Sequence, residues 1–161
     1  MRIIGIDPGL NVTGYGVIDV EASRCVHIAH GVIRTRVADG VAARLVAIRD
    51  GVEEAARQWL AVQSAIEASF VGENARSALA LGQARGAAIL GLAAAGLPVH
   101  EYTPALVKQT VAGYGRGEKS QIAQMVRLQL SLQELPGPAD AADALAVAIT
   151  HWAHSRLEAR T

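Results

Sequence analysis

The chain opens with Arg2-Ile3-Ile4-Gly5-Ile6-Asp7-Pro8-Gly9 and soon continues with Thr13-Gly14-Tyr15-Gly16-Val17-Ile18-Asp19-Val20. The first stretch is a short apolar run that stops at an acid and a Pro-Gly turn signal, which predicts a strand over residues 2–7. The second stretch predicts another strand over 13–20, and residues 25–34 predict a third. Because short turns join these three strands, we expect them to pair antiparallel.

The rest of the chain alternates helical and extended patterns. We expect helices over 41–62, 75–95, 118–130 and 140–156, a short helix capped by Thr103, and strands over 65–70 and 97–101. Strands separated by helices usually pair parallel through right-handed crossovers. The pattern therefore predicts an α/β fold with a mixed five-stranded sheet, three strands antiparallel and two parallel, and helices on both faces. Without a repeat or a long linker, residues 1–161 form a single domain.

Composition excludes some classes of protein. A single cysteine, Cys25, excludes an intrachain disulfide and a cysteine zinc cluster, and it fits a reducing cytoplasm. The N-terminus lacks the pattern of a signal peptide. The most apolar stretch, residues 86–99, is shorter than the roughly 20 residues that a membrane helix needs. We therefore expect a cytoplasmic protein without a membrane span.

Charge alone does not indicate nucleic acid, because 15 basic and 15 acidic residues cancel. The distribution is more informative. Between residues 76 and 127 two acids, Glu101 and Glu118, stand against six basic residues: Arg76, Arg85, Lys108, Arg116, Lys119 and Arg127. A positive face and an ordinary solvated surface are both compatible with this excess.

Four acids stand at unusual places. Asp7 ends the first predicted strand, where α/β sheets tend to place their sites, although a turn before Pro-Gly would also explain it. Glu67 lies in a run otherwise suited to burial, so it needs a partner, a metal ion or a surface strand end. Asp140 and Asp143 are three residues apart and would share a helix face, but a helix cap and the helix dipole explain both equally well.

Together the four acids permit an oxygen-only metal site. Mg²⁺ prefers such hard ligands, and two Mg²⁺ ions about 4 Å apart can promote phosphodiester cleavage. Mn²⁺ accepts the same ligand set. The spacing in the sequence permits these acids to converge and does not require it.

Nearly the whole chain resembles the RuvC-type Holliday junction resolvases of the ribonuclease H-like superfamily. The resemblance rests on many short motifs in the same order, namely Ile4-Gly-Ile-Asp-Pro-Gly9, Thr13-Gly-Tyr-Gly16, Ala65-Ile-Glu67, Glu73-Asn-Ala75, Ser77-Ala-Leu79, Leu81-Gly-Gln-Ala-Arg-Gly86, Val107-Lys-Gln-Thr-Val111, Glu118-Lys-Ser-Gln121, Ala139-Asp-Ala-Ala-Asp-Ala-Leu-Ala146 and Ala148-Ile-Thr-His151.

The resemblance implies a homodimer that binds four-way junction DNA and nicks two strands symmetrically, in recombination and DNA repair. By motif match, it implies that four metal-binding catalytic positions are occupied by Asp7, Glu67, Asp140 and Asp143. It further implies a branch-migration helicase partner of the RuvA–RuvB type.

Candidate DNA contacts come from the same comparison and from the residues themselves. Lys108 and Lys119 match family lysines that act on the DNA backbone near the site, and Lys119 is also a catalytic candidate. They flank a Gly-rich loop whose Tyr114 and Arg116 could meet phosphates. Phe70 matches an aromatic that contacts bases at the junction centre, although a core role is equally open from the residue alone. Arg76 is a further candidate for DNA binding.

Three other functions compete with this interpretation. Residues 5–9 with Thr13 and Gly14 also resemble the first phosphate loop of actin-like and sugar-kinase-like proteins, but a second such loop is lacking. A non-cleaving junction-binding module would not need all four acids. A ribonuclease H-like nuclease for RNA–DNA hybrids, or a transposase, would use the same acids.

A zinc site at His151 and His154 is disfavoured, since neither a cysteine cluster nor a nearby acid completes it.

Overall fold

The computed structural model describes residues 1–69, 73–113 and 119–159, without the side chains of Lys119 and Glu158. Within this part of the chain, five strands form one sheet in the order β3-β2-β1-β4-β5. The strands are β1 (Arg2–Asp7), β2 (Val12–Glu21), β3 (Arg24–Arg34), β4 (Gln63–Glu67) and β5 (Val99–Tyr102). The β1–β2 and β2–β3 pairs are antiparallel, whereas β1–β4 and β4–β5 are parallel. The predicted mixed sheet is confirmed.

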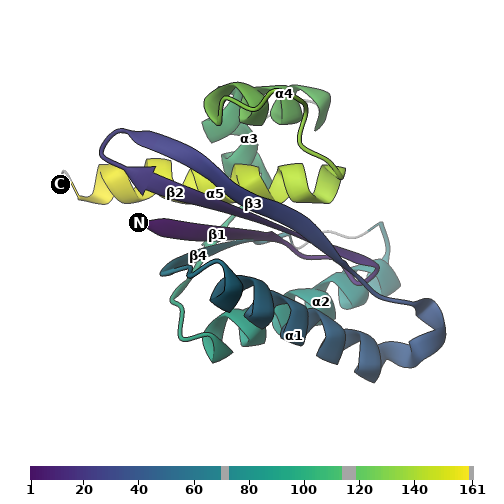
Figure 1. Ribbon diagram of the computed structural model, residues 1–161. Coiled ribbons are helices and arrows are strands. Elements are labelled where there is room, and N and C mark those ends of the chain that lie inside the picture. The colour runs from purple at the N-terminus through teal and green to yellow at the C-terminus, as the bar shows by residue number, and fades with distance from the viewer. Residues whose placement is uncertain (70–72, 114–118, 160–161) are drawn as a thin grey trace.

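Helices cover both faces of the sheet (Figure 1). The described helices are the short 3₁₀ helix η1 (Val37–Asp39) and α1 (Gly40–Gln58), α2 (Ala75–Ala94), α3 (Pro104–Ala112), α4 (Lys119–Gln129) and α5 (Ala139–Glu158). Helices α1 and α2 pack together on one face. Helix α5 lies directly on the other face, and α3 and α4 lie over α5 (Figure 1).

Helix α1 ends earlier than its apolar periodicity predicts. The predicted helix reached residue 62, but the chain leaves the helix after Gln58, and Leu60 adopts a left-handed φ of 54°. Val62 then donates a backbone hydrogen bond to Arg2. Strand β4 begins at Gln63 for this reason and ends at Glu67 rather than at residue 70. Pairing with β1 therefore overrides the local helical pattern.

Helix α2 is, among the described residues, long and apolar enough to cross a membrane, with a mean hydropathy of 1.2 over 18 residues. Its buried side chains Ala84, Ala88 and Leu92 nevertheless belong to the core cluster beneath α1. A helix that packs in this way on a neighbouring helix and on a sheet has the pattern of a core helix with one exposed face.

Three glycines of the opening motifs let α5 lie unusually close to the sheet. A Cβ atom at Gly14 would be 2.0 Å from the Asp140 carbonyl oxygen, and one at Gly5 would be 2.2 Å from that of Ala144. A Cβ atom at Gly16 would be 2.7 Å from the Leu145 backbone nitrogen. Contacts this short to backbone atoms exclude any side chain, so these positions in β1 and β2 require glycine.

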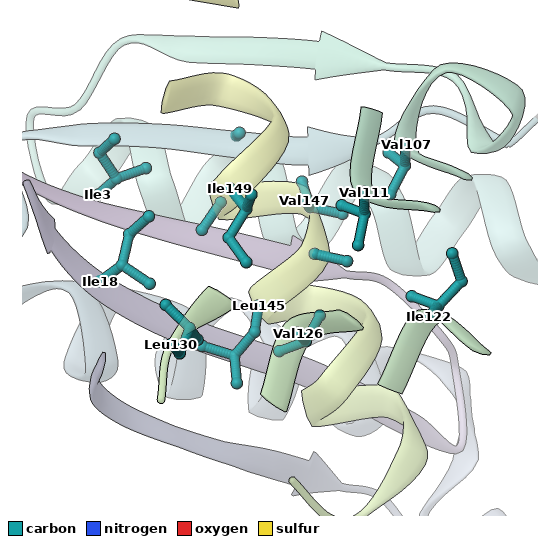
Figure 2. Packing of buried hydrophobic residues seen from close by; sticks show 13 residues of the cluster. Ile3, Ile18, Val107, Val111, Ile122, Val126, Leu130, Leu145, Val147 and Ile149 are labelled. Carbon is teal, nitrogen blue, oxygen red and sulfur yellow. The ribbon is translucent and has the colours of Figure 1, made fainter. Parts of the chain in front are cut away.

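The core on this face surrounds α5 (Figure 2). Residues 141–151 of α5 are buried apart from Asp143, which is half-buried. Leu145 and Ile149 point from α5 toward Ile3, Ile18 and the helices above (Figure 2). Burying each such side chain stabilises the fold by roughly 1.5–3 kcal/mol. The packing therefore fixes the helix that carries Asp140 and Asp143.

Candidate active site

Asp7 and Glu67 lie beside each other at one end of the sheet. Asp7 is the last residue of β1, and Glu67 is the last residue of β4. These strands are parallel neighbours, with Ile6 paired to Ile66. Their carboxyl ends therefore meet at the same edge, and both acids are half-buried there.

Helix α5 brings the other two acids to this edge. Gly14 is paired with Asp7 and also contacts the backbone of Asp140, so the start of α5 lies over the end of β1. The interpretation of Asp140 as the N-cap is wrong. Pro138 occupies that position, and Asp140 follows within the first turn, where its charge still favours the helix dipole.

A cleft of about 280 Å³ connects three of the four acids with a lysine. Its lining consists of Asp7, Glu67, Ser69, Pro104, Val107, Lys108, Ile122, Asp143 and Ala146. Asp140 lies one turn before Asp143 and does not line this cleft. Carboxylates outnumber the lysine three to one among these lining residues.

The remaining predicted DNA contacts lie partly outside the described residues. Lys108 is half-buried on α3 in the cleft wall, and Arg76 is exposed in the first turn of α2, away from the cleft lining. Phe70, Tyr114 and Arg116 are outside the part of the chain that the structure describes, as is the side chain of Lys119.

Carboxylate oxygens that line one cleft are a suitable donor set for Mg²⁺. Among the described residues, however, no group of three His, Cys, Asp or Glu side chains is already close enough to hold a metal ion. The donor chemistry fits the metal, although the described side chains are not drawn together around an ion.

Two polar side chains, Thr13 and Arg44, hold the turn after Asp7, a role that the sequence analysis did not assign to them. Buried Thr13 donates from Oγ1 to the Gly9 carbonyl oxygen at 2.8 Å and accepts from the Gly9 N–H at 3.2 Å. Arg44, 8% exposed, hydrogen bonds to the Leu10 carbonyl oxygen and to the Asn11 side chain. The sequence signal is the position of Arg44, which stands four and eight residues before Ile48 and Val52 and so on the apolar face of the predicted helix.

The two histidines that a zinc interpretation would pair make other contacts. His151 contacts Tyr102 and Gln63, and His154 contacts Thr110 at 3.2 Å. Both ring nitrogens of His151 and Nε2 of His154 are thus hydrogen-bonded within the fold, which argues further against zinc.

The sheet has the order β3-β2-β1-β4-β5, and acids lie at the ends of two neighbouring parallel strands and on the helix packed against them. This combination defines a ribonuclease H-like nuclease. The family model described as "Crossover junction endodeoxyribonuclease RuvC" matches residues 3–151. The chain belongs to this RuvC family. It is a crossover junction endodeoxyribonuclease, a hydrolase, and the phosphate-loop and pure binding-module alternatives do not hold.

Individual relatives agree with the family model. The crossover junction endodeoxyribonuclease RuvC of Burkholderia vietnamiensis is 57% identical over 155 residues, which are 96% of this chain and 84% of the relative. Thermus thermophilus RuvC superposes with a TM-score of 0.89 at 35% identity over 98% of this chain and 97% of that chain. The same T. thermophilus protein in complex with Holliday junction substrate gives 0.92 at 34% identity, over 98% and 96%.

Proposed function

We propose that this chain resolves four-way DNA junctions by metal-assisted hydrolysis in the cleft between β1, β4 and α5, through symmetric paired nicks in recombination and repair. The observation that carries the proposal is the convergence of Asp7, Glu67 and Asp143 with Lys108 in one cleft. The similarity to T. thermophilus RuvC, whose structure contains a Holliday junction substrate, supports the choice of DNA.

The four acids would hold two Mg²⁺ ions, with Asp7 shared between them and Glu67, Asp140 and Asp143 completing the ligands. Mn²⁺ accepts the same oxygen ligands. When bound, Mg²⁺ supplies Lewis-acid stabilisation of the charge that develops on the phosphate. Because the described cleft lining is net negative, a DNA phosphate meets repulsion there until cations neutralise the acids.

The chain's basic side chains would orient the DNA. Lys108 lines the cleft and would donate to a phosphate beside the scissile bond, while Lys119, at the start of α4, would neutralise the scissile phosphate. Arg76, Tyr114 and Arg116 would add backbone contacts, and Phe70 would stack on a base at the junction centre.

A homodimer would explain paired nicks, because a two-fold assembly presents two equal sites. An apolar groove of about 310 Å³ between α1 and α2 includes Leu45, Gly86 and Leu90, and Leu90 is 60% exposed. We propose this groove as the dimer contact, since exposed apolar patches mark interaction surfaces. A branch-migration helicase of the RuvA–RuvB type as partner and a cytoplasmic location complete the proposal.

The test is cleavage of an end-labelled synthetic four-way junction with Mg²⁺, beside a linear duplex and an RNA–DNA hybrid. We expect symmetric nicks in the junction alone, which EDTA abolishes. Asp7→Asn should abolish cutting while leaving junction binding in Ca²⁺ largely intact. Normal cutting by Asp7→Asn would refute the site assignment, and preferential cutting of the hybrid would refute the substrate.

A further inference from the structure

The end of β4 that carries Glu67 is held by β5. The register between β1 and β4 runs as far as the pair Ile6 and Ile66, whereas the register between β4 and β5 extends to the pair Glu67 and Tyr102. The Ala68 N–H donates to the Tyr102 carbonyl oxygen at 2.8 Å. Glu67 is thus paired with Tyr102, the last residue of β5, and the backbone directly after Glu67 is hydrogen-bonded to it.

A buried histidine in α5 holds Tyr102 in turn. The Tyr102 hydroxyl lies 2.8 Å from His151 Nδ1, and His151 Nε2 lies 3.3 Å from Gln63 Oε1. His151 is 3% exposed, and the His100 ring stacks on it with 4.4 Å between centroids. Because Gln63 is the first residue of β4, His151 connects the start of β4 with the end of β5.

The charge state of His151 determines which group donates and which accepts in each of these two hydrogen bonds. Burial, with the charges of His100 and His154, lowers the pKa of His151 to about 4, so the ring is neutral at pH 7. The Gln63 carbonyl oxygen can only accept, so His151 Nε2 carries the proton and donates. Nδ1 is then the acceptor, and the Tyr102 O–H donates to it.

We propose that Tyr102 and His151 are positioning residues for Glu67. Their hydrogen bond fixes the end of β5, and the end of β4 that carries Glu67 pairs with it. The inference rests on the proposed role of Glu67 as a metal ligand. Partners that orient a ligand are a general feature of metal sites, and their loss weakens metal binding. Neither residue touches the metal or the DNA in this proposal.

Tyr102→Phe tests the proposal because it removes one oxygen atom and keeps the ring. The probe is Mn²⁺ alone, with binding measured by water-proton relaxation in the absence of DNA. Loss of one net hydrogen bond predicts binding weakened about 3- to 10-fold. We expect an equal rise in the Mg²⁺ concentration for half-maximal junction cleavage, with the rate at saturating Mg²⁺ and the junction affinity in Ca²⁺ unchanged.

Two further variants separate positioning from general stability. Tyr15→Phe is the matched control, because Tyr15 packs with the core cluster on the opposite face of the sheet, and it should bind Mn²⁺ as the unaltered chain does. His151→Gln retains an acceptor for Tyr102 and a donor for Gln63, so it should restore more Mn²⁺ affinity than His151→Leu does.

The outcomes distinguish this inference from the proposed function. If Glu67→Gln weakens Mn²⁺ binding and Tyr102→Phe does not, the positioning role is refuted and the metal site stands. A lower melting temperature of Tyr102→Phe with unchanged Mn²⁺ affinity also refutes it, since the role is then structural. If Asp7→Asn and Glu67→Gln both bind Mn²⁺ normally, the proposed metal site itself fails.

Discussion

Gly14→Ala should move the acids of α5 away from the acids at the ends of β1 and β4. The added Cβ would lie 2.0 Å from the Asp140 carbonyl oxygen, 2.3 Å from its carbon and 2.9 Å from the Ala141 nitrogen. These are backbone atoms of a packed helix, so no rotamer change relieves the contact. Because non-bonded carbon atoms need roughly 3.5 Å, the start of α5 or the start of β2, where Gly14 lies, must move by about 1 Å.

The displacement has two measurable consequences. Overpacking of this kind destabilises a fold by about 1–3 kcal/mol, which lowers the melting temperature by roughly 2–10 °C in a domain of this size. A misplacement of about 1 Å at a catalytic group costs about 100-fold in rate. We therefore expect single-turnover junction cleavage at saturating Mg²⁺ to fall about 100-fold well below the melting temperature, with junction affinity in Ca²⁺ largely retained.

Gly91→Ala is the matched control. Its Cβ would lie 2.5 Å from the Arg49 carbonyl oxygen, in the contact between α1 and α2 on the other face of the sheet. Gly91 does not line the apolar groove proposed for the dimer contact, and sedimentation checks that the variant remains a dimer. We then expect a similar loss of melting temperature and cleavage within about 2-fold of the unaltered chain. Equal loss of cleavage in both variants would show that stability, rather than the position of Asp140, controls the rate. Unchanged stability and cleavage in Gly14→Ala would refute the close approach of α5.

Three further predictions concern charge, pH and assembly. Lys108→Ala should slow cleavage and reduce the salt dependence of junction binding by about one phosphate contact, and an unchanged slope of affinity against salt would remove Lys108 from the DNA interface. The lowered pKa of His151 means that the unfolded chain binds more protons between pH 4 and 6.5, so this part of the stability is present above pH 6.5 and is lost as the pH falls toward 4. Denaturant titrations should show about 2 kcal/mol lost between pH 7 and pH 5, and the same loss in His151→Gln would refute this cause. Leu90→Glu should place a charge in the α1–α2 groove and shift sedimentation toward the monomer, whereas an unaltered dimer would locate the contact elsewhere.

Local patterns predicted the parts of the fold that depend on neighbouring residues in the chain. The apolar run of residues 2–7 and the Pro-Gly turn predicted β1 and its end at Asp7, and the parallel pairing of β1 with β4 placed Glu67 beside it. Features that depend on distant residues were missed. The end of α1 at Gln58 is imposed by pairing to β1, through the hydrogen bond from Val62 to Arg2.

The site was predicted as a set of residues and not as a geometry. Residue type and spacing indicated that acids could converge, whereas the cleft shared with Lys108 exists because α3 packs on α5. The hydrogen bonds between His151, Tyr102 and Gln63 join residues far apart in the chain, so the periodicity of apolar residues could not predict them.

Small residues at the contact between α5 and β1 hold the helix close to the strand. Helix α5 is enclosed by the sheet on one side and by α3 and α4 on the other (Figure 1). Its buried face toward β1 consists of small residues, with Ala144 and Ala148 against Gly5. A larger side chain at any of these positions would push the helix away from β1 and carry Asp140 and Asp143 with it. The close approach of the acids on α5 to the acid at the end of β1 therefore depends on Gly5, Ala144 and Ala148, whereas Leu145 and Ile149 fill the core beside this contact.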